Sequence, residues 1–208
     1  MRSKRDRASF GPRLLYALQM AVVPPLRDDE RRDEVRKAKS YTFGDFTILC
    51  EPGAANRASV SRVAEALGLI HDVHPRLFRR IRHDLTHFYI RRGAGAQYWS
   101  RLRICVLEAG RVARGPAHEI ALDIVHEAMH ARLINAGVSW VPASFERVER
   151  RCVKEQISFC KRLSEHGYSV GERVSWYEQR LEQPIVTRTA LRARRLRERD
   201  ARKADGLD

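Results

Sequence analysis

"GPAHEIALDIVHEAMHARLINAG", residues 115–137, predicts a single long helix with two apolar sides. Pro116 suits the first helical position and Gly137 suits the residue after the last turn, so both ends are marked. One side carries Leu122, Val125, Met129 and Leu133, and the opposite side carries Ile120, Ile124, Ala128 and Ala131. A helix that is apolar on two sides lies inside a domain, so this stretch predicts the central helix of the fold.

The same helix contains the motif HExxH, as His126, Glu127 and His130. Residues four apart share a helix face, so the two imidazoles can converge on one metal ion, typically Zn²⁺. The glutamate after the first histidine can then act as general base on a metal-bound water. Without a metal, two buried histidines would need hydrogen-bond partners. A catalytic zinc site of this kind also needs a third protein ligand outside the motif.

The residues before the central helix predict a small sheet with two covering helices. Helical spacing of apolar residues appears in residues 58–73 and 75–85, and strands are expected in residues 41–52, 85–92 and 101–110. The glycine-bearing stretch "RRGAGAQYWS", residues 91–100, is interpreted as a connection. We expect residues 102–107 to form an edge strand beside the central helix, antiparallel to its neighbours, where a peptide substrate could align.

This order of elements resembles the zincin metallopeptidases, in particular the thermolysin-like gluzincins, over residues 42–163. It also resembles small uncharacterised bacterial proteins in which the HExxH helix is followed by a helix like "VERRCV", here residues 148–153. The residues after His130, "ARLINAG", lack the metzincin extension. The resemblance implies an α+β domain: a small mixed sheet whose edge strand packs on the HExxH helix, followed by a second, glutamate-bearing helix. It also implies a zinc-dependent peptidase.

In gluzincins the third zinc ligand is a glutamate on the following helix, about 20 residues beyond the second histidine. Here that helix is expected from Ser144 to about Gly167, and its apolar face runs through Phe145, Val148, Cys152, Phe159 and Leu163. At about 100° per residue, Glu149 lies within about 40° of the centre of this face, whereas Glu146 and Glu155 lie near its edges. A carboxylate on an apolar face needs a partner. Glu149, 19 residues after His130, is therefore the predicted third ligand.

Other residues are weighed as further parts of the site. His166 and Tyr168 follow the glutamate-bearing helix and are candidates for the donor that stabilises a transition-state oxyanion. Asp123 and Asp84 are both open as partners of a ligating imidazole. Cys152 and Cys160 are interpreted as buried core thiols rather than ligands. We expect the histidines at 71, 74, 83 and 87 to be exposed or structural.

The composition is that of a soluble domain, with 43% hydrophobic and 32% charged residues among 208. The four cysteines form no CxxC pair, which favours reduced thiols and a cytoplasmic protein. The longest apolar run, residues 14–23, is far shorter than the roughly 20 residues of a spanning helix. The following "MAVVPPL" also offers no convincing signal-peptide cleavage site. No membrane span is expected.

Three segments are predicted: a basic N-terminal segment with a short amphipathic helix (1–40), a zincin-like domain (41–183) and a charged, disordered tail (184–208). The predicted function is zinc-dependent hydrolysis of a peptide or protein substrate, with zinc on His126, His130 and Glu149 and with Glu127 as base. The alternative comes from the net charge of +14. It is a protein that binds nucleic acid or another anionic surface through basic segments, in which the metal is structural or absent.

Overall fold

A five-stranded mixed sheet and seven helices make up the described part of the chain, so the predicted α+β class is confirmed. The computed structural model describes residues 27–54, 56–93, 95–139 and 142–183. The elements are α2 (Asp28–Lys37), β1 (Lys39–Phe43), β2 (Phe46–Cys50), α3 (Arg57–Val73), α4 (Pro75–Asp84), β3 (His87–Arg91), β4 (Gln97–Trp99), β5 (Ile104–Glu108), α5 (Ala109–Arg114), α6 (Ala117–Asn135), α7 (Pro142–Glu165) and α8 (Gly171–Glu182).

The strands lie in the order β1-β2-β3-β5-β4. β2, β3 and β5 run parallel, whereas β1 and β4 pair antiparallel with β2 and β5. The prediction that residues 102–107 form the sheet edge was therefore wrong, because β5 lies between β3 and β4. Its run of four buried residues, Ile104 to Leu107, is typical of an interior strand that is covered on both faces. The edge on this side of the sheet is β4, which lies in residues 91–100, the stretch interpreted as a connection.

The two faces of the sheet are covered by different helices. Side chains alternate along each strand, so Leu49, Tyr89 and Val106 lie on one face, with Val35 and Ala38 of the α2 region against them. Ile48, Phe88 and Leu107 lie on the opposite face, in the main core with α3 to α7. α2 precedes the predicted domain start at residue 41, yet its Glu34 pairs with Arg91 of β3 at 3.1 Å.

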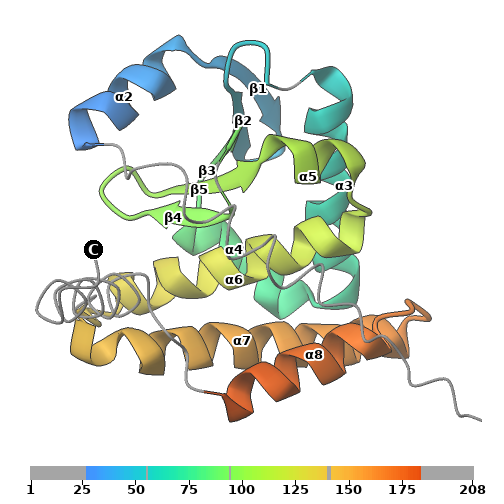
Figure 1. Ribbon diagram of the computed structural model, residues 1–208. Helices are drawn as coiled ribbons and strands as arrows, with labels where there is room; N and C mark the ends of the chain where they lie inside the picture. The colour runs from blue at the N-terminus through green and yellow to red at the C-terminus, as the bar shows by residue number, and fades with distance from the viewer. Residues whose placement is uncertain (1–26, 55, 94, 140–141, 184–208) are drawn as a thin grey trace, which may run out of the picture.

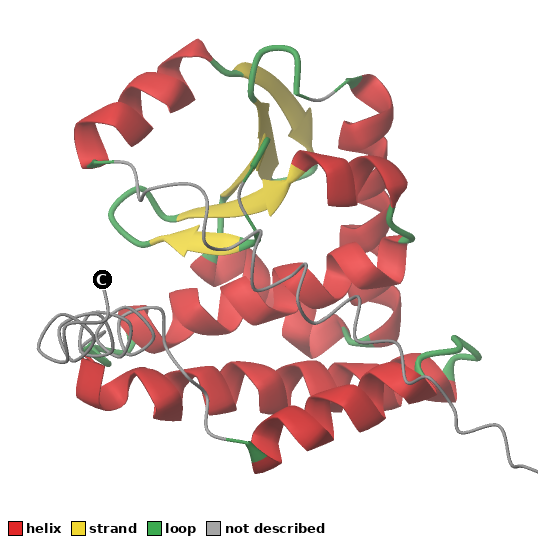
Figure 2. Cartoon of the chain, in the orientation of Figure 1, coloured by secondary structure: helices red, strands yellow, loops and turns green. Residues whose placement is uncertain are grey.

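α6 is the central helix that the sequence predicts. It packs against β4 and β5 on one side and against α7 on the other, and both of its apolar sides are buried. Figure 1 shows α7 and α8 side by side beneath α6, with the sheet above it and α2 beyond the sheet. In Figure 2 the helices other than α2 gather on one side of the strands. α6 therefore presents residues to the sheet and to α7 at the same time.

α8 was not predicted from the sequence. Its Val174, Tyr177 and Leu181 pack at helical spacing on the core, and α8 lies along α7. Within the described residues, no helix has the length and apolar content needed to cross a membrane. The expected amphipathic helix near residues 13–23 and the expected tail at 184–208 fall outside the described ranges.

Candidate metal centre

Three side chains from α6 and α7 converge on one point. The Nε2 atoms of His126 and His130 are 3.1 Å apart. Glu149 reaches both: Oε2 is 3.5 Å from His126 Nε2, and Oε1 is 3.1 Å from His130 Nε2. The helical pitch aligns the two histidines on the α7 side of α6, and the apolar face of α7 turns Glu149 toward them.

The spacing of these atoms fits a tetrahedral metal ion. Zinc binds imidazole nitrogen and carboxylate oxygen at about 2.0–2.2 Å, so neighbouring ligand atoms of a tetrahedral site lie about 3.3 Å apart. The two Nε2 atoms are 3.1 Å apart, and each has one Glu149 oxygen nearby, Oε2 at 3.5 Å from His126 and Oε1 at 3.1 Å from His130, so these contacts lie around this value. Glu146 and Glu155 point elsewhere: Glu146 pairs with Arg150 at 2.9 Å and Glu155 with Arg80 at 3.0 Å. Of the three candidate glutamates, Glu149 alone meets the histidines.

The charges at this point depend strongly on one another. Burial raises the pKa of Glu149, but hydrogen bonds and charge from the two imidazoles outweigh it and hold the pKa well below its ordinary value. Burial lowers the pKa of His126, yet Glu149 and Glu127 together raise it to about 9. Burial also lowers the pKa of His130, with the charge of His126 acting in the same direction. The side chains of His126, His130 and Glu149 thus form a buried site that attracts a cation. In the absence of a metal ion this cation is the proton held by His126.

Gln156 fixes the orientation of the first imidazole. Its Nε2 donates to the carbonyl of Leu122 at 3.0 Å and to the hydroxyl of Tyr177 at 3.1 Å. A carbonyl can only accept, so the amide nitrogen must face Leu122 and Oε1 must face His126 Nδ1, 3.0 Å away. Nδ1 of His126 therefore carries a proton, and Nε2 is the nitrogen that faces Glu149 and a metal.

Cys152 is a second donor near the histidines. His126, His130 and Cys152 form a group that can hold a metal ion, with ligand atoms within 4.8 Å of one another. However, the Cys152 sulfur lies 3.5 Å from Nδ1 of His130, the ring nitrogen that does not face Glu149. Burial, followed by the charges of Glu149 and Glu127, raises the pKa of this thiol. The compact donor set is therefore His126, His130 and Glu149, with Cys152 behind His130.

Glu127 follows His126 directly, about 100° further round α6, on the flank that faces the sheet. The side chain is buried, and a backbone hydrogen bond from Tyr98 of the edge strand β4 reaches it. Burial is the main cause that raises the pKa of Glu127 to about 8, and the charge of His126 opposes it. Glu127 thus lies next to the histidine pair without belonging to the triangle of ligand atoms.

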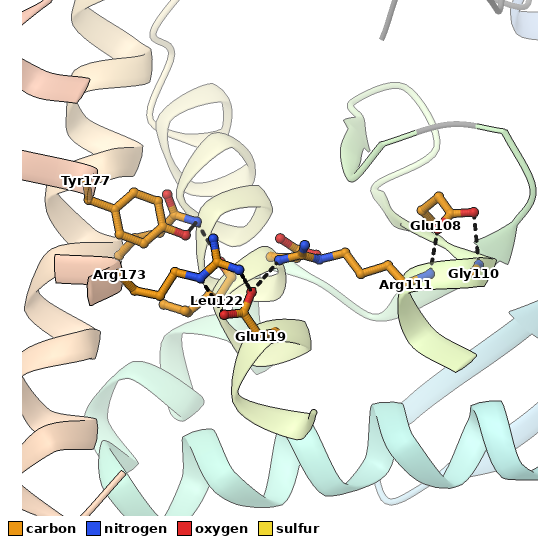
Figure 3. A network of polar contacts seen from close by, with 9 residues as sticks. Glu108, Gly110, Arg111, Glu119, Leu122, Arg173 and Tyr177 are labelled. Carbon is orange, nitrogen blue, oxygen red and sulfur yellow. Dashed lines mark hydrogen bonds and ion pairs between the residues drawn. The ribbon is translucent and has the colours of Figure 1, made fainter. Parts of the chain in front are cut away.

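A polar network holds α5, α6 and α8 together near the start of α6 (Figure 3). Glu119 accepts from Arg173 of α8 at 2.5 and 2.7 Å and from Arg111 of α5 at 2.9 Å. Arg111 also pairs with Asp123, and Glu108 caps α5 by accepting from the backbone of Gly110 and Arg111. Tyr177 lies one turn after Arg173 on α8 and accepts a hydrogen bond from Gln156, which in turn contacts His126.

Several sequence candidates lie away from this point. His166 and Tyr168 follow the far end of α7, and 17 residues of helix separate His166 from Glu149, about 25 Å along the axis. His166 contacts its own helix, and Tyr168 lies against His118, so the structure brings neither to the histidine pair. Asp123 pairs with Arg111, and Asp84 contacts His83 and Asn135. Neither aspartate supports a ligating imidazole.

Two neighbours of the site were missed by the sequence reading. Gln156 stands seven residues after Glu149, on the same helix face, so a polar residue within the apolar stripe was an available signal. Arg180 of α8 approaches Glu149 Oε2 at 3.9 Å while lying over the Trp176 ring. No sequence pattern pointed to Arg180 as a neighbour of Glu149, because the helix that carries it, α8, was not predicted.

Comparisons with known proteins add no relative to this geometry. No protein-family model matches the chain, and no curated protein or solved structure matches it significantly.

Proposed function

We propose that this protein is a zinc-dependent hydrolase that acts on peptide bonds, with His126, His130 and Glu149 as zinc ligands and Glu127 as general base. One observation carries the proposal: the lone-pair atoms of three side chains from two helices meet at separations of 3.1 to 3.5 Å, with one Glu149 oxygen facing each imidazole. Gln156 supports it, because it leaves the Nε2 atom of His126 available.

Zinc in this position would supply a Lewis acid and would lower the pKa of a bound water toward 7. Glu149 contributes a carboxylate that stays anionic, which reduces the net charge of the loaded site. Glu127 contributes a carboxylate whose pKa of about 8 lets it take up and release a proton near neutral pH. Its place directly after His126 is where HExxH chemistry requires the proton acceptor.

A peptide is the favoured substrate because Glu127 lies beside the edge of the sheet. β4 is one of the two edge strands of the described sheet, and the backbone of its Tyr98 hydrogen-bonds to Glu127. Extended peptides pair with exposed strand edges through backbone hydrogen bonds, whatever their side chains. An aligned peptide would lie next to the proposed base.

The test is metal analysis joined to a hydrolysis assay. Purified protein is expected to contain about one zinc per chain. It should release fluorescence from quenched peptide mixtures, lose this activity with a chelator and regain it with added zinc. Absence of zinc together with failure to bind added zinc would refute the proposal.

Cobalt substitution separates the two donor sets. A thiolate ligand gives Co²⁺ a charge-transfer absorption in the near ultraviolet that nitrogen and carboxylate ligands do not give. The proposed site predicts no such band, with Cys152→Ser keeping its metal and Glu149→Gln losing it. A thiolate band that disappears in Cys152→Ser would instead assign the third ligand to Cys152.

A structural metal is the second candidate, and burial favours it. The side chains of His126, His130 and Glu149 are only 14%, 4% and 10% exposed. Structural zinc sites are closed, whereas catalytic sites keep a position for water. Full zinc content without hydrolysis of any peptide mixture, together with a large loss of thermal stability on chelation, would establish this candidate instead.

A further inference from the structure

A second polar surface lies on the opposite flank of α6 from the metal centre. An open groove runs between α4 and the last turns of α6. α4 contributes Arg76, Arg79, Arg80 and His83 to its walls, and α6 contributes Arg132 and Asn135. We call this surface the arginine groove. His126 and His130 do not line it.

The positive charge of the arginine groove is only partly neutralised. Glu155 pairs with Arg80 at 3.0 Å, and Asp84 lies 3.1 Å from His83. Arg76, Arg79 and Arg132 are exposed and have no ion-pair partner within the described ranges. The pKa of His74, at the edge of the groove, is lowered by burial first and then by Arg162 and Arg80, which agrees with a positive potential there.

The arrangement fits a row of negative charges better than a single anion. Arg76, the adjacent pair Arg79 and Arg80, and His83 follow one another at helical spacing of three to four residues, so they lie along one face of α4 over about 10 Å. Neighbouring phosphates of one DNA strand rise about 3.4 Å along the helix axis and lie about 7 Å apart through space, so a row of this length faces about two phosphates. Guanidinium groups also bind phosphate oxygens in bidentate fashion.

The lining distinguishes a nucleic acid from an acidic polypeptide. The groove is lined by arginine, histidine, asparagine and one carboxylate, the buried Asp84 that accepts from Asn135, and its one apolar side chain is Ala136. A bound peptide normally gains affinity from pockets for its apolar side chains, whereas phosphate contacts need only cationic and amide donors. We propose that the arginine groove binds the phosphate backbone of a nucleic acid. This binding is independent of the metal centre and of peptide hydrolysis.

The experiment measures the affinity of the full chain for fluorescein-labelled 20-base-pair DNA and RNA duplexes across a salt series. The test variant combines Arg76→Gln, Arg79→Gln and Arg132→Gln. We expect it to bind at least one of the duplexes about tenfold more weakly or worse at 0.1 M salt. Its salt dependence on a double-logarithmic plot should also be shallower by about two to three.

A matched control removes the same charge elsewhere. Arg57→Gln, Arg114→Gln and Arg147→Gln together alter three exposed arginines that do not line the groove. The control is expected to bind within about threefold of the parent, since general charge acts only through screened long-range forces. All six arginines are exposed, so both variants should melt like the parent, and equal melting temperatures and circular dichroism spectra confirm intact folding.

Three outcomes overturn the proposal. One is that the native chain binds neither duplex at 0.1 M salt. Another is that the test and control variants weaken binding equally, which would assign the effect to net charge alone. The third is that polyglutamate displaces the duplex as effectively, per negative charge, as unlabelled duplex does, which would assign the groove to an acidic polypeptide.

Discussion

Glu127 and Glu149 are buried to nearly the same degree on two flanks of the α6 helix, yet their pKa values are shifted in opposite directions from the ordinary value of a glutamate. As whole residues they are 4% and 7% exposed. Burial by itself raises the pKa of both. On the sheet side, the charge of His126 opposes burial only in part while Glu149 and Asp123 add to it, and the pKa of Glu127 rises to about 8. On the α7 side, two imidazoles lie within 3.5 Å of Glu149 and hold its pKa below the ordinary value.

The comparison shows that partners, rather than burial, assign roles to these carboxylates. A permanently anionic group between two imidazoles suits a metal ligand, whereas a group that titrates near neutral pH suits proton transfer. Neither role follows from the residue type. Each depends on which element packs against the side chain: β4 for Glu127, and α6 for Glu149.

The largest expected effect is the loss of peptide hydrolysis in Glu127→Gln, a variant that should keep its zinc. Glu127→Gln should lower peptide hydrolysis by about 10²- to 10⁴-fold, because the amide cannot accept a proton although it fills the same space. Its zinc content should equal that of the parent, since Glu127 lies outside the triangle of ligand atoms. Metal analysis and the fluorescent peptide assay are run on the same sample. Loss of zinc in this variant would erase the distinction between the two carboxylates.

Glu149→Gln should produce the complementary result. Zinc affinity should fall at least about 100-fold, because one of three protein ligands becomes a neutral amide. The metal-free protein should also lose about 3 kcal/mol of unfolding free energy, since a buried charged imidazole loses its partner. Chelator competition and chemical denaturation measure the two quantities. Glu146→Gln is the control, because Glu146 is exposed and paired with Arg150 on the same helix. Equal effects of the two substitutions would refute the assignment.

Gln156→Leu tests how the α7 side orients its first histidine. Removing the amide frees Nδ1 of His126, so the ring can adopt either tautomer and zinc affinity should fall about 10- to 100-fold. Leucine is similar in size and Gln156 lies on the apolar face of α7, so the fold should survive, at a cost of about 1–3 kcal/mol for the buried His126 and Tyr177 groups that lose a partner. Chelator competition is the measurement. Unchanged affinity would show that helix geometry alone positions the imidazole.

The sequence predicted those parts of the site that follow from the geometry of one helix. The bounds of α6 and the direction of Glu149 both follow from a period of 3.6 residues, and the structure agrees with them. The same rule could have excluded His166 and Tyr168, since about 25 Å of helix separates His166 from Glu149. That prediction relied on sequence order where distance was already available.

The features that the sequence did not predict depend on contacts between distant segments. β4 has three residues, too few to show strand periodicity, and its place at the edge depends on pairing with β5. α8 has no side-chain cap at its start, so its first turn lacked the usual signal. Consequently the partner of Glu127 on β4, and both Tyr177 and Arg180 on α8, could be found only in the folded chain.

A pH series sharpens the comparison on the sheet side. Because the pKa of Glu127 is raised in the folded state to about 8, its contribution to metal-free stability is fully present below about pH 4.5. That contribution is lost as the pH rises toward and through 8. Glu127→Gln lacks this loss, so it should gain roughly 3 kcal/mol relative to the parent between pH 5 and pH 8. Thermal melts of both chelated proteins check this. A constant difference across the range would contradict the raised pKa.

The smallest expected effect concerns Tyr177→Phe, which tests how far support of the metal side extends. The Tyr177 hydroxyl accepts one hydrogen from Gln156, but the other amide hydrogen still binds the carbonyl of Leu122. That remaining bond is enough to keep Oε1 directed at His126, because a carbonyl accepts only from the amide nitrogen. Unfolding free energy should therefore fall by about 1 kcal/mol, the usual cost of one lost hydrogen bond, with zinc affinity changed less than about threefold. If Tyr177→Phe instead weakens zinc binding as much as Gln156→Leu, the orientation of His126 depends on α8. In that case zinc affinity would depend both on the ligand Glu149 and on α8, a helix linked to His126 through Gln156.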